Sequence, residues 1–311
     1  MNKMKRKIKE WANKPFLTFV DVFLYYFVRN RLTQSAAALS YFFALAIFPF
    51  LIALLNIVRF IDISFVPQLL STFDQLPQAV RDIFVKFLAD LQSSSSATLL
   101  TVSLIATIYV ASNGVRQVIL SINDIYDYVE TRSPLVLIAM SFFLTLFLFF
   151  LIILLFVMQG PGKLLVLRGL NFLKLDVRLI EFISGIFRLV PMLYMILIFY
   201  LLYRVAPSWK SQERPKTSST LISATVATLG IVSATLGFSY YVEHFSNYNA
   251  TYGSLAGIVV FLVWLYLFGL MILAGGAVQA TIHTMDSKEE LWPRKETLLA
   301  GFIGGTWRVE E

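Results

Sequence analysis

The chain carries few side chains that could perform catalysis or hold a metal ion. Cysteine is absent, and His244 and His283 are the only two histidines. No HExxH, P-loop or GxSxG pattern occurs, so the spacings typical of zinc proteases, nucleotide-binding loops and serine hydrolases are missing. The lack of cysteine also excludes disulfide bonds and thiolate chemistry. The sequence therefore predicts no catalytic residue, no metal site and no cofactor.

Three acidic residues lie close together in one short segment: Asp124, Asp127 and Glu130. Carboxylates at this spacing could hold a divalent ion together with water. Arg116 and Arg132 are near them in the sequence, and mixed charges at a membrane edge more often form a solvated ion-pair network. The ion-pair interpretation is favoured, and a metal bound by the three carboxylates is the alternative.

Arginines at the ends of apolar segments are the other candidates for binding. Arg188 interrupts the apolar stretch 182–203. A charged residue at membrane depth usually faces a cavity or a partner, although a long side chain can instead reach the membrane surface. Because guanidinium groups bind phosphate well, we expect Arg188, Arg116 and Arg204 to contact an anionic substrate or lipid headgroup.

Membrane-spanning helices must position these residues. Of the 311 residues, 58% are hydrophobic and only 14% are charged, more apolar surface than a soluble core absorbs. Five neutral stretches exceed the ~20 residues that a helix needs to cross the ~30 Å hydrocarbon layer, and the stretch with Arg188 makes a sixth. The five are residues 32–58, 91–115, 133–162, 217–242 and 244–285. The sequence predicts an all-α polytopic membrane protein with six transmembrane helices.

Two shorter amphipathic helices are expected at the membrane surface. Residues 16–28 would cover only ~20 Å as a helix, with Thr18, Asp21 and Tyr25 on one side, so an interfacial helix fits better than a span. Residues 80–91 place apolar and charged side chains on opposite helix faces, either at the outer surface or capping the bundle. The predicted parts are a basic N-terminal segment with an interfacial helix, a six-helix transmembrane domain and a cytoplasmic tail: residues 1–34, 35–283 and 284–311.

The positive charges orient the predicted spans. Most of the 26 Lys and Arg residues fall on one side of the six spans, so both termini are predicted to be cytoplasmic. Lys163, Arg168, Lys174 and Arg178 are exceptions that would lie outside. The net charge of +7 indicates contact with anionic lipid headgroups. Aromatics are not interleaved with clustered basic residues, so no nucleic-acid partner is predicted, and protein partners cannot be read from the sequence.

Polar residues distinguish some spans from others. The second and fifth are rich in Ser and Thr and are expected inside the bundle, whereas the third is nearly all Phe, Leu and Ile and is expected to face lipid. A polar segment, residues 246–257, precedes the sixth span and is first an outer turn whose Gly253 allows close helix contact. A role for Tyr252 and Ser254 in lining a substrate path is the alternative.

Four stretches in this order resemble the YihY/BrkB family of bacterial inner-membrane proteins, once named after a ribonuclease. They read LTQSAAALSYFFALAIFPFLIALL, ASNGVRQVILSINDIYDYVETRS, YRVAPSWK and NYNATYGSLAGIVVFLVWLYLFGLMILAGGAVQA. The family pattern falls on Tyr41, Pro49, Asn123, Tyr126, Arg132, Tyr203, Pro207, Gly253, Trp264 and Gly275.

The resemblance implies a six-span bundle of the bacterial cytoplasmic membrane with both termini inside the cell. It implies no defined activity, and no metal-ligand cluster supports the nuclease name. The family often has a glutamate near the end of the last span, whereas this chain reads GGAVQ at residues 275–279. A mechanism that needs an intramembrane carboxylate at that place is therefore weakened.

Three functions fit these observations. We expect a transporter or flippase-like lipid-handling protein for an amphipathic or anionic substrate. The alternative is a non-transporting membrane scaffold, which a bundle packed shut between the second, fifth and sixth spans would favour. A membrane-embedded hydrolase or nuclease comes third, because it would need clustered titratable groups around a metal.

Overall fold

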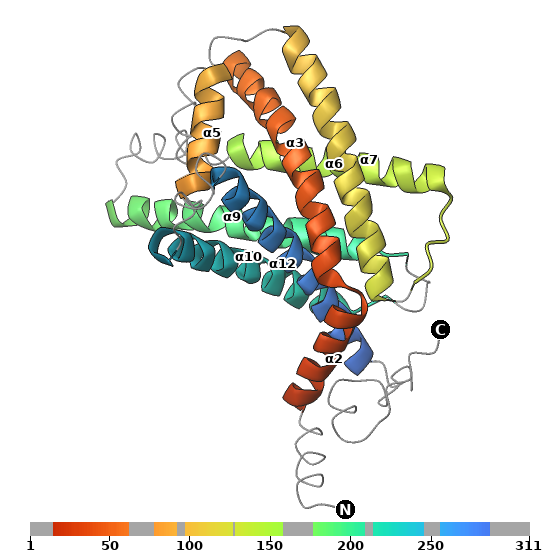
Figure 1. Ribbon diagram of the computed structural model, residues 1–311. Coiled ribbons are helices and arrows are strands. Elements are labelled where there is room, and N and C mark those ends of the chain that lie inside the picture. The colour runs from red at the N-terminus through yellow and green to blue at the C-terminus, as the bar shows by residue number, and fades with distance from the viewer. Residues whose placement is uncertain are drawn as a thin grey trace, which may run out of the picture.

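Helices form nearly all of the structure, as the long apolar stretches predict. The computed structural model describes residues 15–61, 78–91, 97–126, 128–157, 177–208, 214–245 and 256–286, and this part of the chain contains no strand (Figure 1). The all-α fold class is confirmed. The helices are α2 (Pro15–Arg29), α3 (Leu32–Ile61), α5 (Gln78–Leu91), α6 (Ala97–Ile125), α7 (Pro134–Val157), α9 (Val177–Val205), α10 (Thr217–Phe245) and α12 (Ala256–Asp286).

Five of the described helices are long and apolar enough to cross a membrane: α3, α6, α7, α10 and α12. Each corresponds to one of the five neutral stretches of the sequence. In α9 the apolar segment whose side chains the structure describes is Leu189–Val205, which covers about 25 Å at ~1.5 Å per residue. The protein is thus a multi-pass membrane protein, and the sixth span remains a prediction.

The last helix, α12, lies at the centre of the bundle. In Figure 1, α3 runs beside α6 and α9 runs beside α10, and the two pairs cross at a wide angle with α12 between them. Helix α12 packs against α3, α6 and α10, and also against α2 and α5. Its residues 275–281 are all buried. In the described part of the chain, the larger hydrophobic core forms around the C-terminal half of α12, and a smaller one forms around its N-terminal half.

Helix α6 has a buried face that carries hydroxyl groups and an exposed face that is apolar. Val102, Ile105 and Tyr109 are exposed along one face of α6. Thr107 and Ser112 donate to carbonyl oxygens of their own helix, at 2.7 and 2.6 Å, so these hydroxyls need no partner on another helix. Ser103 and Thr107 are buried, so the hydroxyls of the second span lie on the face of α6 that packs inside the bundle, as expected. The exposed phenylalanines of α7 agree with the lipid-facing position expected for the third span.

One end of the bundle, named here the α2 end, is where α3, α7 and α10 begin and α6, α9 and α12 end. Helix α2 docks there on α12, and the hydroxyls of Tyr26 and Thr284 lie 2.8 Å apart in a hydrogen bond. Helix α2 confirms the helix predicted over residues 16–28, and its place at the membrane interface stays a prediction. The next helix begins at Leu32 rather than at Ser35, because the carbonyl of Arg31 accepts hydrogen bonds from the next turn and starts α3 earlier.

At the opposite end, named the α5 end, an amphipathic helix caps the bundle. Val80 and Phe84 of α5 are buried. The ring of Phe84 lies 5.6 Å from that of Phe261, and Phe48 packs edge-on against both Phe87 and Phe261. These four phenylalanines, called the aromatic cap below, join α3, α5 and α12. Of the two positions that the sequence left open for this helix, capping is the one observed.

Candidate functional site at the α2 end

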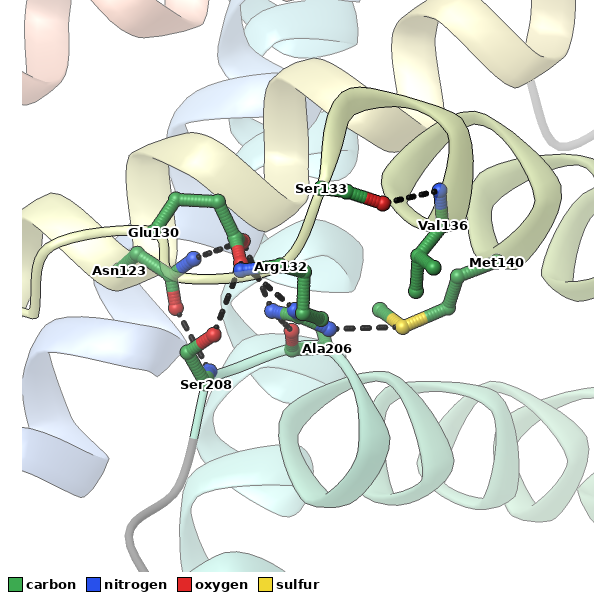
Figure 2. Close-up of polar contacts among 8 residues, drawn as sticks. All are labelled: Asn123, Glu130, Arg132, Ser133, Val136, Met140, Ala206 and Ser208. Atoms are coloured by element: carbon green, nitrogen blue, oxygen red, sulfur yellow. Dashed lines mark hydrogen bonds and ion pairs between the residues drawn. The ribbon is translucent and has the colours of Figure 1, made fainter.

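A polar network joins the loop after α6 to the end of α9. Its members are Asn123, Glu130, Arg132 and Ser208 (Figure 2). Helix α6 ends at Ile125, and the chain then passes through an irregular loop before α7 begins. In this loop the Arg132 side chain donates two parallel hydrogen bonds to the Glu130 carboxylate, Nε to Oε1 at 2.7 Å and Nη2 to Oε2 at 2.9 Å. Paired bonds of this kind are strong and directional.

The network connects residues that are far apart in the sequence. Asn123 donates to Glu130 Oε2 at 2.8 Å and accepts from the backbone N–H of Ser208 at 2.9 Å. The Ser208 hydroxyl donates to Glu130 Oε1 at 2.9 Å. Arg132 also donates to the carbonyl of Ala206 at 2.9 Å. Figure 2 shows the Glu130 carboxylate at the centre of these contacts, so it fixes the α6–α7 loop to the end of α9.

The Glu130 carboxylate is held in its charged form. Burial by itself would raise its pKa, but the hydrogen bonds from Arg132, and then the bond from Ser208, outweigh burial and lower the pKa. The ion-pair interpretation of this acidic segment is therefore confirmed for Glu130. Among the described residues no three acidic or histidine side chains are arranged to hold a metal ion. Asp127 lies outside the described residues.

Three helices approach one another closely at Gly275. The Tyr203 hydroxyl of α9 donates to the carbonyl of Ile272 on α12 at 2.6 Å, and Tyr203 is fully buried. A methyl group added at Gly275 would overlap the Tyr203 hydroxyl oxygen and would lie 2.7 Å from Cβ of Ala227 on α10. Only glycine fits between these two neighbours. One turn further on, buried Gln279 donates to the Thr220 hydroxyl of α10 at 2.8 Å.

The arginines predicted to bind a substrate are engaged in separate contacts. Arg116 hydrogen-bonds to Asn113 on its own helix. Arg204 donates to the carbonyl of Pro215 at 2.8 Å and fastens the end of α9 to the segment before α10. Arg188 belongs to α9, but its side chain is outside the described part of the structure, as are Tyr252, Gly253 and Ser254 in their entirety. These positions remain predictions, and no shared site for Arg116 and Arg204 is seen.

The other family-pattern positions are spread over the bundle. Tyr41 is largely exposed on α3, and Pro49 lies inside the same helix. Tyr126 stacks on Tyr128, with 5.4 Å between ring centroids. The indole N–H of Trp264 donates to Thr235, which links α12 to α10. Buried Pro207 precedes the serine of the polar network. These contacts hold helices and loops together rather than surrounding one cavity.

An open hollow of about 590 Å³ lies beside the polar network at the α2 end. We call it the arginine hollow; it is lined by Arg29, Asn30, Arg31, Asp124, Tyr128, Val129 and Glu130. The turn between α2 and α3 forms one wall, and the end of α6 with its loop forms the other. Sequence reasoning used its two arginines only to orient the spans. Basic residues just before one span and an acidic residue at the end of the next are the signal that could have located it.

The fold and this polar end define a polytopic α-helical membrane protein. The family described as "Virulence factor BrkB" matches residues 23–298. The chain belongs to this family, as the four motif stretches indicate.

Relatives cover most of the chain. The "ribonuclease-like protein YfkH" of Bacillus subtilis is 31% identical over 251 residues, 80% of this chain and 90% of the relative. The "UPF0761 membrane protein NTHI0384" of Haemophilus influenzae is 26% identical over 271 residues, 85% of this chain and 94% of the relative. No solved structure matches the chain. The Haemophilus relative is named as a membrane protein without an activity, and the Bacillus relative is named only as like a ribonuclease.

Proposed function

We propose that the protein is a lipid-handling transporter of the bacterial cytoplasmic membrane, which accepts an amphipathic substrate with a phosphate-bearing headgroup at its α2 end. The observation that carries this proposal is the arginine hollow. It opens at the end of the bundle and contains two guanidinium groups, which suit phosphate. The chain contributes membrane-spanning helices on both sides of it, so a lipid could reach the hollow from the bilayer.

The two ends of the bundle differ in a way that supports access from one side. At the α5 end, the aromatic cap fills the space between α3, α5 and α12 with apolar side chains, including buried Phe84 and Phe261. At the α2 end, the arginine hollow is open and polar. A transporter that receives its substrate on one face and is closed on the other has this arrangement.

We further propose that the α2 end faces the cytoplasm. Among the described residues, this end holds the basic side chains of Arg29, Arg31, Arg132, Arg204, Arg214 and Lys216. The positive-inside rule places such residues in the cytoplasm. Helix α10 offers a direct test, because Arg214 precedes its start and Glu243 lies near its other end, and both are exposed.

The native chain has no cysteine, so single-cysteine variants can be labelled without background. In intact spheroplasts, a membrane-impermeant maleimide is expected to label the Glu243→Cys variant at once, and the Arg214→Cys variant only after the membrane is opened. The reverse pattern would place the α2 end outside the cell.

The proposed function is tested by reconstitution into liposomes of phosphatidylethanolamine and phosphatidylglycerol with a trace of fluorescent phosphatidylethanolamine. Dithionite added outside destroys the outer-leaflet label in every vesicle. In vesicles that contain the protein it is expected to destroy inner-leaflet label as well, because lipid moves across. Arg188 stays a proposed headgroup contact, and the Arg188→Ala variant is expected to slow this movement. Equal fluorescence loss with and without protein would overturn lipid transport.

A scaffold without transport is the second candidate, and one observation favours it. Helices α10 and α12 are packed closely, and Ala224, Leu273 and Ala277 have no exposed surface. Gly276 of α12 also lies against Ile122 and Ile125 of α6. A scaffold needs no path through this core. Protein that inserts correctly into liposomes and moves no lipid would favour the scaffold.

A further inference from the structure

We infer that the arginine hollow binds the headgroup of a zwitterionic phospholipid, with the phosphate at Arg31 and the ammonium group toward Asp124, which deepens the proposed lipid-handling function and rests on it. The ligand class is a phosphate diester that carries a positively charged amine. Four observations point to it: the position of the hollow at the edge of the membrane, its mixed charge, the pairing of Glu130 with Arg132, and the surroundings and backbone of Arg31.

The hollow lies at the level where two helices leave the membrane. The apolar span of α3 begins at Leu32, directly after Arg31. The apolar span of α6 ends at Ile125, directly after Asp124 and three residues before Tyr128. Both walls of the hollow therefore stand next to the edge of the hydrocarbon layer, where phospholipid headgroups lie. A lipid with its chains beside α3 or α6 brings its headgroup to the height of the hollow.

The charges in the hollow suit a dipolar ligand better than a simple anion. Arg29 and Arg31 supply positive charge from one wall, and Asp124 and Glu130 supply negative charge from the other. Arg132 neutralises Glu130 through their paired hydrogen bonds. Exposed Asp124 adds a second carboxylate to the wall that faces Arg31. A headgroup with phosphate at one end and ammonium at the other complements both walls, whereas phosphatidylglycerol offers Asp124 only neutral hydroxyl donors and no positive charge.

Arg29 and Arg31 have different surroundings. The Arg29 guanidinium hydrogen-bonds to the Tyr25 hydroxyl and lies 5.3 Å from the centre of the Tyr25 ring. The Arg31 side chain makes no such contact with the described part of the chain; it is exposed and lines the hollow. Arg31 is therefore the guanidinium best placed to take a ligand phosphate.

The backbone of Arg31 supports a role for its side chain. Its φ is 47°, in the left-handed region that side-chain-bearing residues adopt at a cost and glycine adopts freely. The turn needs this conformation, because Arg31 N–H bonds to Val28 and its carbonyl accepts from Gln34 and Ser35. Glycine at this corner would serve the fold better. Arginine at a position that favours glycine is explained when its guanidinium binds a ligand.

Binding is measured on the full chain purified in detergent, by native mass spectrometry during titration with phosphatidylethanolamine or phosphatidylglycerol. Wild type is expected to bind one phosphatidylethanolamine about threefold more tightly than phosphatidylglycerol, since Asp124 is exposed and its effect is modest. The Asp124→Asn variant is expected to lose this preference. Equal affinity of wild type for the two lipids would overturn the inference.

The Arg31→Gly variant separates ligand binding from folding. It removes the guanidinium and relieves the backbone, so its melting temperature should equal or exceed that of wild type, while phosphatidylethanolamine binding falls about tenfold. Arg214→Gly is the matched control, because it removes one exposed arginine at the same end outside the hollow; its lipid affinity should stay that of wild type. Unchanged binding by Arg31→Gly would overturn the inference.

Two further results distinguish a lipid from free phosphate as the ligand, and the binding site from the proposed transport. Millimolar inorganic phosphate is expected to leave the bound lipid in place; displacement by phosphate alone would mean that the hollow takes a free anion and would overturn the lipid assignment. The binding measurement needs no transport. Selective binding without lipid movement in liposomes would keep this site and refute the transporter, whereas movement without selective binding would keep the transporter and refute the site.

Discussion

The Gly275→Ala variant is expected to be destabilised by about 2–3 kcal/mol, because its methyl group has no space. It would overlap the Tyr203 hydroxyl oxygen and lie 2.7 Å from the Ala227 Cβ atom. Neither neighbour can move aside easily: Tyr203 is fully buried and hydrogen-bonded to Ile272, and Ala227 Cβ is attached directly to the backbone of α10. The apparent melting temperature in detergent should fall by roughly 4–12 °C.

Gly237→Ala provides the matched control for this prediction. Gly237 lies on α10, which also packs against α12, and a methyl group added there meets nothing within 4 Å. Alanine favours a helix over glycine, so this variant should melt at the wild-type temperature or slightly above it. Equal melting temperatures for Gly275→Ala and Gly237→Ala would mean that α9, α10 and α12 do not approach one another as closely at Gly275 as described.

The Glu130→Ala variant is expected to lose about 3 kcal/mol of stability, since it leaves the Arg132 guanidinium in a mostly buried place without its carboxylate. The Glu130 and Arg132 side chains are only 15% and 19% exposed. The change also removes the acceptor for Asn123 and Ser208, so the α6–α7 loop is held to the end of α9 more weakly, through the bond from Arg132 to the Ala206 carbonyl. Thermal melting and protease cleavage in this loop would report the two effects.

Acid should reduce the difference between wild type and Glu130→Ala. The folded state lowers the Glu130 pKa below its ordinary value of 4.5, so the carboxylate contributes stability above that value and loses it as the pH falls through the lowered pKa. The melting temperatures of the two proteins should converge in acid.

Glu243→Ala is the control for the loss of stability, because Glu243 is exposed and accepts a hydrogen bond from Ser239 on its own helix. Its free energy of unfolding is expected to change by no more than about 0.5 kcal/mol. An equally large loss in both variants would contradict a special role of Glu130.

Local sequence patterns were sufficient to predict the individual helices. Long neutral stretches located α3, α6, α7, α10 and α12, because only an uninterrupted apolar helix is stable in the hydrocarbon layer. The spacing of Thr18, Asp21 and Tyr25 located α2, and the apolar stripe of residues 80–91 located α5. These signals depend on neighbouring residues within one helix, so a single sequence contains them in full.

Contacts between distant segments could not be read in the same way. Asn123 and Ser208 are 85 positions apart, and nothing in the pattern of either helix specifies which helix end the other meets. Likewise, the hydroxyls of the second span indicated its buried face, but they do not specify a partner helix, because Thr107 and Ser112 donate to carbonyl oxygens within α6. The arginine hollow was missed for the same reason, since its two walls come together only in the folded bundle.

The most direct test of lipid handling at the α2 end is the rate of phosphatidylethanolamine movement in liposomes with wild type, Arg31→Gly and Arg214→Gly reconstituted at equal density. Wild type and Arg214→Gly are predicted to move the lipid at similar rates above protein-free vesicles, with Arg31→Gly several-fold slower at an unchanged melting temperature. Equal rates of lipid movement with all three proteins would show that the arginine hollow takes no part in transport. No lipid movement with wild type would contradict lipid transport altogether.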